Sequence, residues 1–300
     1  MERLCKKMEE RFSKTSEDNS AFDINNHLKR NERFNKSIVV CDSLVCLMFC
    51  IFPIIQSFLE YLSSSTEDRK FVYLLPYMMW YPFNTQRLLN YIVAFSSQCL
   101  VTYMITSFYL GHDMFLTTFV YIVNMYLSYI EFKIHEFKPT NTDEDNHYLS
   151  QLLAFHSDIY GYVKQIDEIF SIAMLWNYFA ACLTLCLVGY QVAAGTDYLH
   201  LLKFFGFLVS MLWHVYIISV VSTELITQSS GIGDAFYHQE WYDASNKYKR
   251  MLLLPIARAQ RPAHITAFKF FDISMQSFTN LLSTTYQVFT LLRTSLETST

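Results

Sequence analysis

Two acidic side chains interrupt long apolar runs of this 300-residue chain and are the first candidates for chemistry. Asp113 is the more conspicuous, because a charge within a long apolar helix is costly and commonly functional. It could belong to an ion path, or it could lie near the cytosolic boundary of a membrane and make a hydrogen bond between helices. We favour the hydrogen bond. Asp42 lies near one end of another apolar run, where we expect water to reach it.

No pattern typical of an enzyme or a metal site accompanies these acids. The nine His show no metal-ligand spacing, and no Gly-rich phosphate loop, Ser-His-Asp order or Cys-His pair stands out. Paired acids or His within membrane spans, which an intramembrane enzyme would need, are not expected. The seven Cys lie mostly in apolar runs, which indicates packing groups rather than disulfides. We therefore predict neither an enzyme nor a cofactor. The 23 basic and 27 acidic residues argue against a nucleic-acid partner.

The elements that carry these residues are predicted to be membrane helices. The chain is 52% hydrophobic and has only 7 Gly and 6 Pro, which is too apolar for an ordinary soluble domain. Several runs of about 20 residues carry few charges, and this length crosses about 30 Å of hydrocarbon. The predicted fold class is all-α, a polytopic helical membrane protein with five spans. They are placed at about 37–59, 88–132, 169–192 and 199–221, with a last helix at 264–295.

Two of the apolar runs are too long for one crossing. Residues 88–132 are broken only by Gly-His-Asp at 111–113. They form either two spans joined by a hairpin or one helix of about 65 Å, whose second half leaves the membrane and is buried against other helices. The single helix is favoured. The amphipathic stretch 151–170 likewise continues into the span at 169–192.

Positively charged residues indicate the orientation. Segments on the N-terminal side of the spans hold seventeen Lys or Arg against five on the other side, which places the N-terminus in the cytosol. All helix extensions then lie on the cytosolic side. The remaining segments are a cytosolic N-terminal segment at 1–36, four spans with their extensions within 37–242, a cytosolic anchor helix at 243–261 and an extracellular tail at 296–300.

The C-terminal region links a basic, proline-broken stretch to the last apolar helix. Residues 252–293 read "LLLPIARAQRPAHITAFKFFDISMQSFTNLLSTTYQVFTLLR", with hydroxyl groups among Phe and Leu. Those hydroxyls suit either close helix packing or a wetted pore. The segment resembles the C-terminal signature of insect odorant receptors. Three upstream segments are also similar to that family: "LPYMMWYPFNT", "HSDIYGYVKQIDEIFS" and "TELITQSSGIGDAFYHQEWYD".

The resemblance, which covers about residues 22–293, implies an odorant-gated non-selective cation channel. Family members have seven helices, a cytosolic N-terminus and four subunits around a central ion path, and those that bind odorants assemble with a shared co-receptor as a hetero-tetramer. The five predicted spans match helices three to seven, so we expect a form that lacks the first two. The seventh helix would be split into a cytosolic half and a pore-lining half. The implied location is the plasma membrane of an olfactory sensory neuron dendrite, in contact with lipid.

The resemblance also implies two groups of site residues. Registering the last helix on the family motif places Leu291 at a hydrophobic gate, with Thr294 and Ser295 one turn further out. A small volatile ligand would bind among the extracellular halves of the helices, where burial against aromatic and Met side chains contributes about 25 cal/mol per Å². The ligand-binding candidates are Phe49, Phe52, Gln56, Tyr91, Val101, Met104, Ile105, Trp213 and Tyr216.

Three other functions remain as alternatives. A gustatory receptor of the same superfamily shares Thr285-Tyr286 in the last helix but would continue with Gln-Phe, which is missing. A non-channel transporter would need broken helices or an internal repeat, and we find no repeat. A metabotropic receptor would need the opposite orientation, which the distribution of positive charge opposes.

Overall fold

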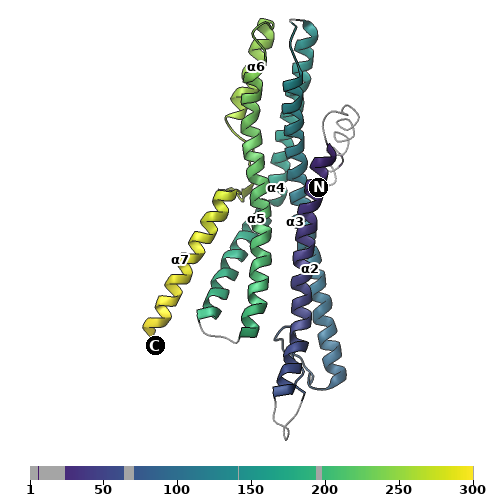
Figure 1. Cartoon of the computed structure of the whole chain (residues 1–300), viewed down its shortest axis with the longest axis vertical. Helices are drawn as coiled ribbons and strands as arrows, with labels where there is room; N and C mark the ends of the chain where they lie inside the picture. Colours follow the sequence, from purple (N-terminus) through teal and green to yellow (C-terminus); the bar gives the residue numbers. More distant parts are fainter. Residues whose placement is uncertain (1–5, 7–23, 64–70, 141, 194–197, 300) are drawn as a thin grey trace. The chain divides into compact units, whose positions relative to one another are not determined.

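Long helices make up almost all of the computed structural model, which describes residues 6, 24–63, 71–140, 142–193 and 198–299 (Figure 1). Within those residues the elements are α2 (Ile24–Ser63), α3 (Leu88–Glu136), α4 (Asp143–Ala193), α5 (Tyr198–His238), α6 (Asn246–Ala259), β1 (Thr266–Ala267), β2 (Phe271–Asp272) and α7 (Met275–Ser299). Four of them, α2 to α5, contain stretches long and apolar enough to cross a membrane. Each of the first four predicted spans lies within one of these helices.

The predicted single helix at 88–132 is confirmed, because α3 runs through Gly111, His112 and Asp113 without a break (Figure 1). One Gly inside a helical apolar pattern weakens a helix by about 1 kcal/mol and does not end it. The second half of α3 is buried, as its composition demands. Val123, Tyr126 and Ile130 are each completely buried.

The chain forms two compact units. Unit 1 comprises Met1–Phe34, Phe115–Leu183 and Val215–Val288, and unit 2 comprises Asn35–Met114, Thr184–His214 and Phe289–Thr300. The core of unit 1 is made by the second half of α3 together with parts of α4 and α5. Ile159 and Ile166 of α4 and Leu225 of α5 are completely buried there.

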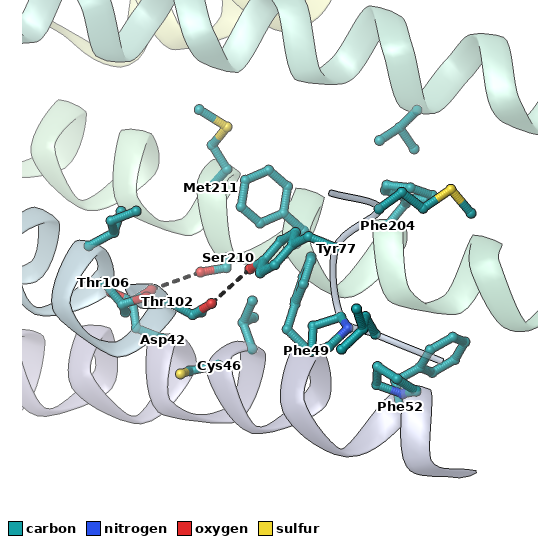
Figure 2. A pocket seen from close by; sticks show the side chains of 18 of the residues that line it. Asp42, Cys46, Phe49, Phe52, Tyr77, Thr102, Thr106, Phe204, Ser210 and Met211 are labelled. Carbon is teal, nitrogen blue, oxygen red and sulfur yellow. Dashed lines mark hydrogen bonds between the residues drawn. The ribbon is translucent and has the colours of Figure 1, made fainter. Parts of the chain in front are cut away.

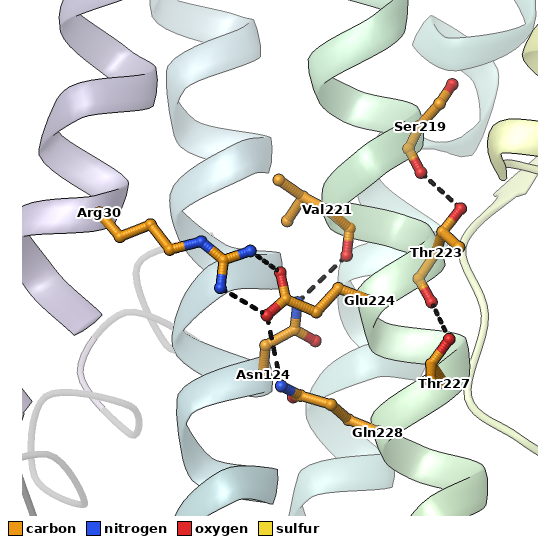
Figure 3. A network of polar contacts seen from close by, with 8 residues as sticks. All are labelled: Arg30, Asn124, Ser219, Val221, Thr223, Glu224, Thr227 and Gln228. Carbon is orange, nitrogen blue, oxygen red and sulfur yellow. Dashed lines mark hydrogen bonds and ion pairs between the residues drawn. The ribbon is translucent and has the colours of Figure 1, made fainter. Parts of the chain in front are cut away.

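Polar contacts join the helices inside unit 1 (Figure 3). Arg30 of α2 donates to both carboxylate oxygens of Glu224 on α5, at 3.0 and 2.6 Å. Asn124 of α3 donates through Nδ2 to the carbonyl of Val221 on α5 at 3.1 Å. The contact of Asn124 is buried, whereas the Arg30–Glu224 pair is partly exposed to solvent. These contacts fix how α2, α3 and α5 pair.

The predicted helix at 264–295 is wrong at its start, since residues 266–272 form a hairpin instead. Thr266 pairs with Asp272 and Ala267 with Phe271, in antiparallel register. Asp167 of α4 accepts hydrogen bonds from the backbone N–H and the hydroxyl of Thr266, at 2.6 and 2.9 Å, and so holds β1 against unit 1. A contact with α4, far away in the sequence, thus stabilises the hairpin.

Helix α7 begins after this hairpin with a reciprocal cap. The Ser274 hydroxyl accepts from the backbone N–H of Ser277 at 3.3 Å, and the Ser277 hydroxyl accepts from the backbone N–H of Ser274 at 2.9 Å. Such a pair satisfies two of the N–H groups that a helix start leaves without partners. The N–H of Met275 donates to Thr223 of α5 at 2.8 Å. The start of α7 is thus attached to unit 1.

The predicted anchor helix at 243–261 corresponds to α6, which is shorter at both ends. Ser245 caps it by accepting from the N–H of Tyr248 at 3.2 Å. Its buried face consists of Tyr248, Leu252, Pro255 and Ala259. Burial raises the pKa of Tyr248 to about 12, and its hydroxyl donates to Gln239 at 2.8 Å.

Candidate functional site

A cavity of about 780 Å³ lies inside unit 2 (Figure 2). This volume is within the range of small-molecule sites, about 300 to 1,000 Å³. Its wall is mostly apolar and comes from four helices and from the loop between α2 and α3. The lining residues are Asp42, Val45, Cys46, Phe49, Phe52, Pro53 and Gln56 of α2; Leu74, Leu75, Pro76, Tyr77 and Met78 of the loop; Thr102, Ile105, Thr106 and Tyr109 of α3; Leu187, Val188 and Gln191 of α4; and Phe204, Phe207, Ser210, Met211 and His214 of α5.

Helical spacing explains how each helix contributes. The lining residues of α2 recur three or four positions apart, and so do those of α3 and α5. Residues at this spacing share one face of a helix. One face of each of these three helices therefore lines the pocket.

The loop between α2 and α3 closes one side of the cavity and is fixed by hydrogen bonds to α2 and α3. Gln98 of α3, which is 4% exposed, accepts from the N–H of Tyr77 at 3.0 Å and donates to its carbonyl at 3.1 Å. Ser57 of α2 accepts from the N–H of Leu74 at 3.1 Å. The hydroxyl of Thr102 donates to that of Tyr77 at 3.2 Å, as Figure 2 shows. The loop thus serves as a lid with a fixed backbone.

Aromatic rings from the lid, α2 and α5 pack against one another in the wall of the cavity. The ring of Tyr77 stacks on that of Phe49, with centroids 5.8 Å apart, and Phe207 meets Phe49 edge to face at 6.0 Å. Ring pairs at these distances are favourable beyond their buried area. A ligand in this cavity would meet aromatic faces on the lid, on α2 and on α5.

A group of buried polar side chains lies at one end of the cavity wall, and we call Asp42, Asp113, Ser210 and His214 the polar cluster. His214 contacts Oδ1 of Asp42 through Nε2 and Oδ2 of Asp113 through Nδ1, both at 2.7 Å. Ser210 donates to Oδ1 of Asp42 at 2.9 Å (Figure 2). Ionised carboxylates only accept, so both ring nitrogens of His214 donate if both acids are ionised.

The polar cluster confirms one prediction and corrects two. The hydrogen bond between helices predicted for Asp113 is present, from α3 to His214 of α5. Water was expected to reach Asp42, but that residue is only 6% exposed because α5 covers it with Ser210 and His214. The expectation that the spans lack paired acids or His is also wrong. The three groups are far apart in sequence, and only the packing of α2, α3 and α5 brings them together.

Four of the nine predicted ligand-binding residues line the cavity: Phe49, Phe52, Gln56 and Ile105. Val101 and Met104 lie on another face of α3 and are 51% and 53% exposed. Tyr91 is not among the lining residues, but it contacts the lid, since its hydroxyl donates to the carbonyl of Leu74 at 3.2 Å.

The last two predicted ligand-binding residues, both on α5, are also outside the lining set. Trp213 is 37% exposed, and Tyr216 packs edge to face on Phe278 within unit 1, with centroids 5.8 Å apart. A step of three or four residues from Ile105 would have found Thr102 and Tyr109, and a step of four from Thr102 would have found Thr106. The loop residues Leu75 to Met78 belong to the family-like segment "LPYMMWYPFNT", but that resemblance did not mark them as ligand-binding.

The predicted pore residues lie on α7. Leu291 is 71% exposed, and Thr294 is exposed with its hydroxyl donating to the carbonyl of Thr290 at 2.9 Å. The side chain of Ser295 lies outside the described residues. Further toward its start, α7 exposes four polar side chains at one helical stripe: Gln276, Asn280, Ser283 and Gln287. By helical spacing, Leu291 and Thr294 continue this stripe.

Comparison with known proteins identifies the family. The family model described as "7tm Odorant receptor" matches residues 1–286. The chain belongs to the 7tm odorant receptor family. It is 27% identical over 296 residues to putative odorant receptor 92a of Drosophila melanogaster, and that match covers 98% of this chain and 72% of the relative. It is 30% identical over 228 residues to putative odorant receptor 85d of the same species, covering 75% of this chain and 55% of the relative.

A solved structure supports the fold of this odorant receptor. The insect olfactory receptor OR5 from Machilis hrabei, determined in complex with eugenol, is similar with a TM-score of 0.74 at 20% identity. The match covers 90% of this chain and 67% of that chain. The protein is thus a multi-pass helical membrane protein of the odorant receptor type. The family match favours this class over the gustatory receptor and the transporter.

Proposed function

We propose that this odorant receptor binds a small, mostly apolar volatile in the cavity of unit 2 and takes part in gating a non-selective cation current. The observation that carries the proposal is the cavity itself, which is large enough for such a ligand and lined mainly by aromatic, aliphatic and Met side chains. Binding would come chiefly from apolar burial, because volatile molecules have few polar groups. The protein acts as a receptor and not as an enzyme.

The channel is proposed to be a hetero-tetramer with the odorant co-receptor, in the plasma membrane of olfactory neuron dendrites and with the N-terminus in the cytosol. The exposed polar stripe of α7 supports a role in lining a water-filled path, since side chains that face only lipid gain nothing from hydrogen-bonding groups. In this arrangement Leu291 forms the gate, and Thr294 and Ser295 hydrate the ion beyond it.

Ligand binding is tested by filling the cavity. The chain is co-expressed with the co-receptor, and currents are recorded while volatiles are applied. Thr106→Trp places an indole in the cavity and should abolish the response to ligands that nearly fill it. Ser107→Trp, one position further on an exposed face of α3, is the matched control and should leave the response intact. An intact response in both variants would show that the ligand binds elsewhere.

The pore is tested with thiol reagents applied from outside. Leu291→Cys should make the current sensitive to a charged reagent, beyond any effect on the chain with its native cysteines. Leu282 lies nine residues earlier, on the opposite side of the α7 helix, so Leu282→Cys is the matched control and should stay insensitive. Sensitivity at both positions, or at neither, would contradict a pore lined by this stripe.

A further inference from the structure

The two acids of the polar cluster differ in how many of their carboxylate oxygens have a hydrogen-bond partner. Asp113 uses both oxygens, since Oδ2 contacts His214 at 2.7 Å and Oδ1 contacts His112 at 3.0 Å. Asp42 uses only Oδ1, which accepts from both Ser210 and His214. Its Oδ2 is buried and has no hydrogen-bond partner among the described residues. One carboxylate oxygen of Asp42 therefore lacks a donor among the described residues, and a ligand must displace the side chains that cover it in order to supply one.

Asp42 lines the cavity, which is the open space from which a donor would approach it. Asp113 does not line the cavity, and the Asp42 side chain is only 8% exposed. The lining set contains no Lys or Arg, and its basic side chain, His214, contacts Oδ1 of Asp42 and not Oδ2. A buried carboxylate oxygen without a partner is strongly unfavourable, and a hydrogen bond to a charged donor is about twice as strong as one between neutral groups.

We propose that Asp42 binds the donor group of the ligand and that this receptor is tuned to small apolar amines, whose ammonium group would lie against Oδ2. The rest of the ligand would fill the apolar cavity between Phe49, Tyr77 and Phe207. The proposal rests on ligand binding in this cavity, as put forward above, and adds a chemical class. An amine should therefore bind more tightly than a molecule of the same size and carbon skeleton that has no donor.

The test measures binding apart from gating and from the co-receptor. The full chain is purified in detergent, and its thermal unfolding midpoint is followed against the concentration of a primary amine, an alcohol and a methyl ether of matched length. A ligand that binds only the folded state raises the midpoint. The amine should reach its half-maximal effect at a concentration about tenfold or more below that of the ether, with the alcohol between them.

Two variants separate recognition from structure. Asp42→Asn keeps an oxygen that accepts from Ser210. In this variant the amine and the ether should reach their half-maximal effects at similar concentrations. Asp113→Asn disturbs the same imidazole but leaves Oδ2 of Asp42 in place, so the preference for the amine should survive. The ratio of the half-maximal concentrations of the two ligands is compared on each variant, so a general loss of stability does not affect the result.

Three outcomes would overturn the proposal: no difference between amine and ether in the unaltered chain, a preference for the alcohol over the amine, or a preference that persists in Asp42→Asn. An ether that stabilises the chain as well as the amine would still support ligand binding in the cavity. Stabilisation by none of the three ligands, together with no volatile-evoked current, would instead count against the proposed function itself.

Discussion

The lid over the cavity depends on one buried amide, and this leads to a quantitative prediction. Gln98 makes three hydrogen bonds to the loop: two with the backbone of Tyr77, at 3.0 and 3.1 Å, and one to the hydroxyl of Tyr81 at 3.1 Å. Gln98→Ala removes all three and leaves the backbone groups of Tyr77 without their buried partner. At about 1 kcal/mol for each bond, with some relief when the loop opens to water, the closed lid loses about 2 to 4 kcal/mol.

The same loop provides the matched control. Gln86 pairs with the backbone of Tyr73 in the same two-point manner, at 3.1 and 3.4 Å, but it is exposed to solvent. Water replaces an exposed hydrogen bond at little cost, so Gln86→Ala should cost the closed lid less than about 1 kcal/mol. Burial, and not the pattern of the bonds, makes the difference.

The assay is the ligand concentration that gives half the maximal current, recorded with the co-receptor and corrected for surface expression. The apparent affinity for the ligand falls in proportion to the population of the closed lid. Gln98→Ala should raise the half-maximal concentration about 30- to 900-fold, and Gln86→Ala should change it by less than about fivefold. Equal shifts for the two variants would refute the assignment of the buried amide as the support of the lid.

Three further predictions concern the thermal stability of the purified protein in detergent. Lys269 has a φ of 61°, which costs a side chain about 1 kcal/mol, so Lys269→Gly should stabilise the hairpin by about that amount; an unchanged or lower midpoint would argue against strain there. A Cβ on Gly189 would meet the ring of Phe289 at 2.6 Å, so Gly189→Ala should destabilise by about 1 to 3 kcal/mol, and adding Phe289→Leu should recover part of the loss. A double-mutant cycle on Arg30→Met and Glu224→Gln should give a coupling of about 1 kcal/mol, reduced by the partial exposure of Arg30, whereas simple additivity would mean that the pair adds nothing.

Composition and periodicity were enough to predict the long helices. Runs such as 88–132 carry their own evidence, because every turn of α3 repeats apolar residues and the only breaker is a single Gly. The hairpin at 266–272 could not be predicted in this way. Its strands have two residues each, and the contact that stabilises it comes from Asp167, about a hundred positions earlier.

The candidate site was predicted only in part for a similar reason. Phe49 and Phe52 line the cavity, and their aromatic side chains made them reasonable candidates from the sequence. The face of α3 that turns toward the cavity is set by packing, which the sequence does not show. The polar cluster escaped prediction because Asp42 and His214 are 172 positions apart and each looks isolated in its own apolar run. Charges that are expensive singly become acceptable once the fold pairs them.

The capped start of α7 gives that helix the properties of a lever. Its first turn is attached to Thr223, and Leu291 follows Met275 by sixteen positions, which places it about 24 Å along the axis. A tilt of about 5° about that attachment would move Leu291 sideways by about 2 Å, given the rise of about 1.5 Å per residue. A small angular change at the base of α7 is thus magnified at its far end.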